Sequence, residues 1–191
     1  MIYVAVGIFG FIVIHFFDIV SLKRIRGAKP VTWVVGSGLL VYSLIMMSLA
    51  PDRLPLPMWS TWLGWGLLLI ALLVLIYSLF INLPFRKTYI TIGVGDKLIT
   101  TGLYALVRHP GVHWFTLAMI ALVLVSRSVL LLIAAPILIL LDILLVFVQD
   151  RFFFGRMFDG YDNYRRVTPM FLPNWQSVNA FIEGLWPARA K

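Results

Sequence analysis

The stretch VHWFTLAMIALVLVSRSVLLLIAAPILILLDILLVFV, residues 112–148, determines the fold class of this chain. It contains two apolar runs, 112–125 and 129–148, separated by Ser126, Arg127 and Ser128. A helix needs about 20 apolar residues to cross the hydrocarbon core of a bilayer; the second run has that length and the first is short. Because three residues allow only a tight turn, the pattern predicts a helical hairpin in a membrane.

The rest of the chain extends this pattern on the N-terminal side. Further apolar runs cover residues 2–22, 31–50 and about 59–83, which gives five predicted spans and an all-α polytopic membrane protein. Hydrophobic residues make up 61% and charged residues 13%, whereas a soluble domain is about half apolar and a quarter charged. The first span is too long for a cleaved signal peptide, and no small-residue cleavage site follows it. The absence of cysteine excludes disulfides, thiolate metal sites and a cysteine nucleophile.

The basic residues predict the orientation of the spans. Fourteen of the 16 Lys and Arg residues fall in segments 23–30, 84–111 and 149–191. These segments lie on one side of the membrane if the five spans alternate in direction. The other side holds Arg53 and Arg127. By the positive-inside rule, the N-terminus lies outside and the C-terminus in the cytoplasm. The net charge of +8 therefore reflects cytoplasmic loops, and we expect no nucleic-acid partner.

We expect one membrane domain, 1–191, with four parts. Three N-terminal spans occupy 1–83, a cytoplasmic loop 84–111, the hairpin 112–148 and a cytoplasmic tail 149–191. Within the tail, 180–186 has the pattern of a short amphipathic segment on the membrane surface.

The candidate site lies in TTGLYALVRHPGVHW, residues 100–114, at the start of the hairpin. Pro110 suits the first position of a helix, and the residue before a proline is held in extended geometry. Arg108 and His109 therefore stand just outside the helix end, where free backbone N–H groups and partial positive charge favour anions. The pattern predicts a site for a carboxylate or phosphate. The alternative is a loop whose arginine binds lipid phosphates.

Polar residues near the cytoplasmic ends of the spans are further candidates. One face of the last helix is predicted to carry three polar residues at i, i+7 and i+8, namely Asp142, Gln149 and Asp150. Asp150 is expected near the same membrane surface as Arg108. His15 and Asp18 could line the same cavity, but a polar contact between helices is the favoured interpretation. His109 and His113 have the i, i+4 spacing of metal ligands, yet no third ligand is evident and we expect no metal site.

These motifs carry a family resemblance. KLITTGLYALVRHP, a hairpin and then QDRFFFGRMFDGYDNYRRVTPMFLP resemble the C-terminal half of the isoprenylcysteine carboxyl methyltransferase family, which belongs with the membrane phospholipid methyltransferases. The similarity covers about residues 97–173. Its core is the G-x-Y-x-x-x-R-H-P motif, and a Y-x-x-Y…P…P pattern follows. The matching positions are Gly102, Tyr104, Arg108, His109, Pro110, Tyr161, Tyr164, Pro169 and Pro173.

The resemblance implies S-adenosylmethionine as cofactor, held between the loop before the hairpin and the segment after it. The implied cofactor-binding residues are Lys97, Leu98, Ile99, Gly102, Tyr104, Arg108, His109, Pro110, Gln149 and Asp150. Arg108 suits the carboxylate of the cofactor, and Asp150 can accept from its ribose hydroxyls or its ammonium. Arg108 and Asp150 are the implied catalytic residues.

The chain departs from the family pattern at two places. Gln149 and Asp150 stand where the family has paired glutamates. Val112 and Trp114 stand where the family has tyrosine and glycine, at the point where the fourth span enters the membrane. The second pair of changes would reshape the channel for the methyl acceptor.

The expected function is methyl transfer to O, N or S of a small lipophilic or lipid-like acceptor that arrives from the bilayer. Membrane lipids are the expected surroundings, in a multi-pass protein of the bacterial plasma membrane. Two alternatives stay open: a non-catalytic relative that binds a lipid or a partner protein, and a small transporter with a polar path through His15, Asp18 and Asp142.

Overall fold

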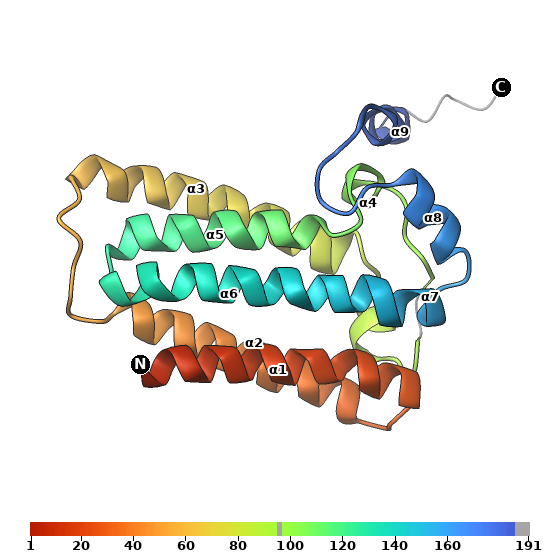
Figure 1. Cartoon of the computed structure of the whole chain (residues 1–191), viewed down its shortest axis with the longest axis horizontal. Coiled ribbons are helices and arrows are strands. Elements are labelled where there is room, and N and C mark those ends of the chain that lie inside the picture. The colour runs from red at the N-terminus through yellow and green to blue at the C-terminus, as the bar shows by residue number, and fades with distance from the viewer. Residues whose placement is uncertain (95–96, 186–191) are drawn as a thin grey trace.

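The helices of this protein form an elongated bundle with a cap of short elements at one end (Figure 1). The structure is a computed structural model, and it describes residues 1–94 and 97–185. The long helices are α1 (Ile2–Lys23), α2 (Ala28–Ser48), α3 (Met58–Ile76), α5 (Pro110–Ser126) and α6 (Val129–Val148). The short helices are α4 (Leu103–Leu106), α7 (Phe154–Met157), α8 (Tyr161–Val167) and α9 (Trp175–Leu185). Three π-helical turns, η1 (Tyr77–Ile81), η2 (Arg86–Ile90) and η3 (Gln149–Phe153), join or extend them.

The predicted spans agree with the long helices to within a few residues. The all-helical class is confirmed for the described residues, and four helices are long and apolar enough to cross a membrane. These are α1, α2, α3 extended by η1, and α6 extended to Met157. The fifth, α5, has 17 residues, which is at the lower limit for a span. Many large apolar side chains on these helices face outward, as expected for lipid-facing surfaces.

Glycines allow the helices to pack closely in two pairs. A Cβ on Gly36 of α2 would lie 2.9 Å from the backbone N of Ile14 in α1. A Cβ on Gly64 of α3 would lie 2.9 Å from the backbone N of Val125 in α5. Small residues at such crossings let backbones approach and increase van der Waals contact, which drives helix association in lipid.

The predicted break between the last two long helices is confirmed. Arg127 ends α5 in the left-handed conformation, at φ 55°, and the side chain of Ser128 caps α6 by accepting from the backbone N of Leu131. The hydroxyl of Ser128 also donates to the carbonyl of Met47 at 2.7 Å, which ties the turn to the end of α2.

The core lies around α6, which runs between the α3–α5 pair and the α1–α2 pair in Figure 1. Leu131, Ala134 and Leu138 of α6 are fully buried, together with Met47 of α2 and Met119 of α5. Beyond this core, η3 and α7 follow α6 directly, so the helical stretch runs from Val129 to Met157. The cap, formed by α4, α7, α8 and α9, lies at the end of the bundle opposite the N-terminus.

The predicted separation of basic residues corresponds to the two ends of the bundle. The α1–α2 loop and the cap lie at the same end, whereas the α2–α3 and α5–α6 connections, which contain Arg53 and Arg127, lie at the end of the N-terminus (Figure 1). At that end Arg53 Nη1 donates to the carbonyls of Ser48 and Ser126. Arg189 and Lys191, which also entered the charge comparison, and Trp186 of the predicted amphipathic segment lie outside the described residues.

Candidate functional site

The helix α5 starts where the sequence predicted it. Pro110 is the first residue of the helix, and His109 precedes it with φ −126° and ψ 67°, which is outside the helical region but not the extended geometry that was expected. Arg108 therefore stands outside the helix, and its backbone N donates to the carbonyl of Pro169 at 2.9 Å. This bond joins the loop before α5 to the segment that follows α8.

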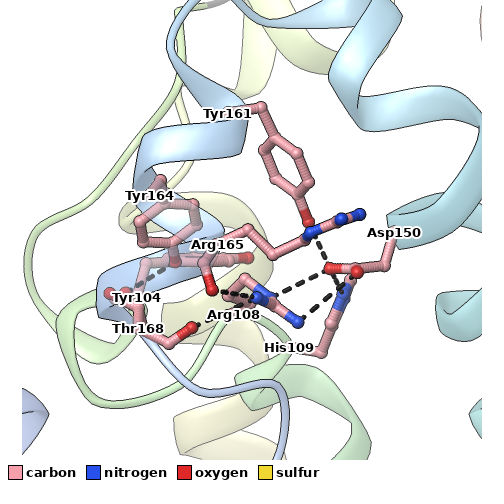
Figure 2. A network of polar contacts seen from close by, with 8 residues as sticks. All are labelled: Tyr104, Arg108, His109, Asp150, Tyr161, Tyr164, Arg165 and Thr168. Atoms are coloured by element: carbon pink, nitrogen blue, oxygen red, sulfur yellow. Dashed lines mark hydrogen bonds and ion pairs between the residues drawn. The ribbon is translucent and has the colours of Figure 1, made fainter.

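The guanidinium of Arg108 pairs with Asp150, as Figure 2 shows. Arg108 Nε lies 2.9 Å from Asp150 Oδ1, and Nη2 donates to Oδ2 at 3.4 Å. Nη1 donates to the carbonyl of Arg165 at 2.8 Å and to that of Thr168 at 3.3 Å. Both charged side chains are about nine-tenths buried. The predicted proximity of Arg108 and Asp150 is therefore confirmed, and the anion beside Arg108 in this structure is the protein's own carboxylate.

His109 lies on the other side of the same carboxylate. Its Nε2 is 3.4 Å from Asp150 Oδ1, and its ring stacks on Phe154 with a centroid distance of 5.7 Å. Burial lowers the pKa of His109, although the hydrogen bond and the charge of Asp150 oppose this effect. His109 is therefore neutral at pH 7, and the tautomer that carries a proton on Nε2 can donate to Asp150.

Two tyrosines of α8 complete the cluster. Tyr161 donates its hydroxyl to Asp150 Oδ1 at 2.5 Å, and Tyr164 donates to the carbonyl of Tyr104 at 2.6 Å. Burial raises the pKa of Tyr161, and the neighbouring Asp150 carboxylate raises it further, so its hydroxyl stays protonated. Burial likewise raises the pKa of Tyr164. The Y-x-x-Y motif thus holds α8 against both the carboxylate and α4.

Gln149 is not part of this cluster, which corrects the predicted shared face of Gln149 and Asp150. Gln149 Nε2 donates to Asp18 Oδ2 of α1 at 2.8 Å, whereas Asp150 turns toward Arg108. The physical reason is that adjacent residues leave a helix about 100° apart, so Gln149 reaches α1 while Asp150 reaches the start of α5. The favoured interpretation of Asp18 as an interhelical polar contact is confirmed.

A residue that the motifs did not single out, Asn82, organises the loop before α4. Its Oδ1 accepts from the backbone N of Leu103 at 3.1 Å, and its Nδ2 donates to the carbonyl of Thr101 at 3.3 Å. Gly102 has φ +61°, and a Cβ there would lie 2.5 Å from Asn82 Oδ1. Only a glycine at position 102 therefore allows this close approach, and an amide after a long apolar run was the available signal for Asn82.

Two cavities adjoin the cluster. The first, of about 320 Å³, lies between the loop before α4, the helix α8 and α9. Its lining is Leu98, Thr100, Ala105, Gly160, Asn163, Tyr164, Val167, Thr168 and Ala180. Of the implied cofactor residues, Leu98 lines this cavity, Tyr104 reaches its wall through Tyr164, and neither Lys97 nor Ile99 is among the lining residues.

The second cavity, of about 360 Å³, lies between α5, α6 and the segment after α8. It is lined by Val112, His113, Thr116, Ile143 and Phe171, and most of its surface is apolar. Phe171 also contacts His109, with a centroid distance of 6.3 Å, so this cavity adjoins the Arg108–Asp150 pair. Val112, one of the departures from the family pattern, is in its wall.

Other polar candidates stay outside these contacts. Asp142 Oδ2 is buried without a hydrogen-bond partner among the described residues. Within the same residues, no group of three His, Cys, Asp or Glu side chains could hold a metal ion.

The comparisons with known proteins identify the family. The family model described as "Phospholipid methyltransferase" matches residues 59–155, just over half of the chain, and the chain belongs to this family. The match begins in α3 and ends in α7, so it includes the whole Arg108–His109–Asp150 cluster. Comparisons with curated proteins and with solved structures gave no match. The protein is thus a membrane-embedded member of a methyltransferase family.

Proposed function

We propose that this protein transfers a methyl group from S-adenosylmethionine to O, N or S of a lipophilic acceptor. The observation that supports this most directly is the Arg108–Asp150 ion pair, which lies beside the first cavity and within the region that matches the family. The methionyl end of this cofactor carries both a carboxylate and an ammonium. An arginine and an aspartate side by side are complementary to that pair of charges.

The residues of the first cavity fit the rest of the cofactor. Its volume of about 320 Å³ is near the lower end of the range for small-molecule sites, about 300 to 1,000 Å³. Thr100 and Asn163 supply a hydroxyl and an amide, which can bind ribose hydroxyls and the edge of adenine. Leu98, Ala105 and Val167 supply apolar walls for a ring. We therefore assign the cofactor to this cavity, with Arg108 behind its wall, where Nη1 donates to the carbonyl of Thr168.

When bound, the cofactor supplies an electrophilic methyl group, so the main contribution of the protein is to position the two substrates. The second cavity is suited to the acceptor, because its lining is mostly apolar and it lies between two membrane helices. Phe171 lines this cavity and contacts His109, so an acceptor in the cavity would lie next to the ion pair. Neutral His109 and protonated Tyr161 fix the Asp150 carboxylate, and an anionic, amine or thiolate acceptor needs no strong general base.

The unequal distribution of basic residues between the two bundle ends supports the predicted orientation and five spans. The cap would then face the cytoplasm, where the cofactor is made, while the acceptor reaches the second cavity from the bilayer. Both substrates would meet at the membrane surface near His109.

The experiment that tests this function is a calorimetric titration of S-adenosylhomocysteine, the expected product, into the purified protein in mild detergent. Asn163→Trp would fill the first cavity from an exposed position on α8, and its neighbour Asp162→Trp, which does not line the cavity, is the matched control. We expect saturable binding that Asn163→Trp abolishes and Asp162→Trp leaves intact. A folded protein that does not bind the product would refute the enzyme function and favour the non-catalytic relative.

A further inference from the structure

The helix α9 has an apolar face that nothing in the described structure covers. Trp175, Ile182 and Leu185 are separated by seven and three residues, a spacing that puts them on one side of a helix. Their exposed fractions are 79%, 51% and 54%. In a water-facing helix this arrangement would expose three large apolar side chains together, which soluble surfaces generally avoid.

The opposite side of α9 is attached to the cap. Ser177 is 1% exposed, Ala180 lines the first cavity, and α9 packs against α4. The start of the helix is fixed by Asn174, whose Oδ1 accepts from the backbone N of Ser177 at 2.8 Å, while the Ser177 hydroxyl accepts from the backbone N of Asn174 at 3.0 Å. Such reciprocal capping defines where a helix begins. The apolar face is therefore held in a fixed direction.

The direction and level of α9 match those of a membrane surface. In Figure 1 the long helices run across the view, whereas α9 is seen end-on, so it lies crosswise to the spans. It projects beyond the side of the bundle that carries α3, level with the cap-side ends of α1 and α6. Outward residues of α3 on the bundle surface, such as Leu69, Ile70 and Leu73, are exposed and apolar.

We propose that α9 is a membrane-surface helix whose apolar face, Trp175, Ile182 and Leu185, enters the boundary between headgroups and acyl chains of the bilayer that the bundle spans. Amphipathic helices bind there with the apolar face buried, and tryptophan favours the headgroup level. Because Glu183 is the one charged residue in α9, the binding depends on apolar area and not on anionic lipids. Because Ala180 of α9 lines the first cavity, the bilayer would then fix the position of one wall of that cavity. The effect on cofactor binding rests on the proposed function, whereas the position of α9 on the membrane does not.

The absence of cysteine makes a direct test possible with the full chain in liposomes. An environment-sensitive fluorophore is attached to Ile182→Cys and, as matched control, to Gln176→Cys, an exposed position on another face of α9. Lipids with a nitroxide on the acyl chain should quench the label at 182 several-fold more strongly than the label at 176, in both zwitterionic and anionic vesicles. Iodide in the water should quench the label at 176 more strongly.

Two results would overturn the seating of α9. Equal iodide quenching at both positions would show a water-exposed face, and protection of position 182 from both quenchers would show a protein contact, such as a second copy. The effect on the cavity is tested separately with Ile182→Ser/Leu185→Ser, which should weaken S-adenosylhomocysteine binding in liposomes several-fold, against Gln176→Ser as control. Unchanged affinity of the double variant for S-adenosylhomocysteine would refute the link between α9 and the cavity. If the unmodified protein does not bind S-adenosylhomocysteine at all, both the proposed function and this link are refuted. The quenching result, and with it the position of α9 on the membrane, would still stand.

Discussion

At the scale of the residue, Arg108 joins three separate parts of the chain. Its guanidinium contacts Asp150 after α6 and the carbonyls of Arg165 and Thr168 at the end of α8. Its own backbone lies just before α5. Arginine is suited to this position because its planar group donates in several fixed directions, whereas the ammonium of lysine is a compact point charge on a flexible stem. Arg108 therefore shapes the candidate site even before any ligand binds.

We expect Arg108→Ala to destabilise the protein by about 3 kcal/mol, because it leaves the buried Asp150 carboxylate without its counter-charge. Thermal unfolding in detergent measures the effect, with the exposed Arg166→Ala on α8 as control. The double variant Arg108→Ala/Asp150→Ala should recover part of the loss, since it removes the uncompensated charge. Additive losses from the two substitutions would show that the ion pair contributes no coupling energy.

His109 gives the site a pH dependence of definite sign. Burial lowers its pKa, so the folded protein takes up this proton at a lower pH than the unfolded chain, in which histidine titrates near 6.5. Below pH 6.5 the unfolded state binds more protons, and stability therefore decreases as the pH falls toward the native pKa. Asp150, Arg108, Phe154 and Phe171 surround the ring, and the favourable contact with Asp150 only reduces the shift.

His109→Gln should flatten this dependence, because the amide can still donate to Asp150 but does not titrate. Thermal unfolding of the two proteins between pH 7.5 and about 5 provides the comparison. His113→Gln, whose ring lines the second cavity, should retain the pH dependence of the unmodified protein. An equally steep loss of stability in His109→Gln would assign the effect to another group.

At the scale of the element, the end of α6 divides two adjacent polar residues between different partners. Their spacing from Asp142 predicted that Gln149 and Asp150 share one face of the helix. Instead Gln149 reaches α1 and Asp150 reaches the start of α5, because adjacent residues leave a helix about 100° apart. Sequence periodicity cannot reveal which partner each residue reaches, because this depends on how α1, α5 and α8 pack around the end of α6.

The contact between Gln149 and Asp18 gives a physical reason for the departure from paired glutamates. An amide at position 149 donates to the Asp18 carboxylate at 2.8 Å, whereas a glutamate there would bring two carboxylates together. We expect Gln149→Glu to destabilise the protein by about 2 kcal/mol, the order of a hydrogen bond to a charged group. Its measure is the shift of the thermal transition.

The exchanged pair Asp18→Asn/Gln149→Glu should restore most of this stability, because donor and acceptor are then reversed across the same contact. Asp18→Asn alone is the matched control, since it removes the charge but keeps the amide at 149. If the exchanged pair is no more stable than Gln149→Glu, the contact does not determine which residue is tolerated at position 149.

At the scale of the whole molecule, the sequence predicted the long helices because membrane spans depend on length and hydropathy alone. Val129–Val148 was predicted to the residue, and the turn at Arg127 was evident from its polar neighbours. Hydropathy did not predict which helices pack against each other, since both the lipid-facing and the core-facing sides of the spans are mostly apolar. The close approach of α5 to α3 at Gly64 depends on shape, which hydropathy does not encode.

The same limit applies to the cap, where the sequence identified the motif residues but not their contacts. It brought Arg108 and Asp150 together correctly, because both were expected at one membrane surface. It missed Asn82 and assigned Gln149 to the wrong neighbours, because these contacts depend on how α1 packs beside the end of α6 and on the loop before α4. Contacts that follow from depth in the membrane were predictable, and those that follow from the direction of a side chain were not.

Depth and charge together also lead to a prediction for the molecule as a whole, the side of the membrane on which the cap lies. Fourteen of 16 basic residues belong to segments assigned to the cap side, and two belong to the opposite end. This asymmetry favours a cytoplasmic cap and an outer N-terminus.

In the cysteine-free chain, Asp52→Cys between α2 and α3 and Asp162→Cys on α8 report the two ends. A membrane-impermeant maleimide should label Asp52→Cys in intact cells and Asp162→Cys only after the membrane is opened. Labelling of Asp162→Cys alone in intact cells would reverse the orientation. Labelling of both positions from outside would contradict an odd number of crossings between them. That odd number requires α5 to span the membrane together with α3 and α6, although α5 has only 17 residues.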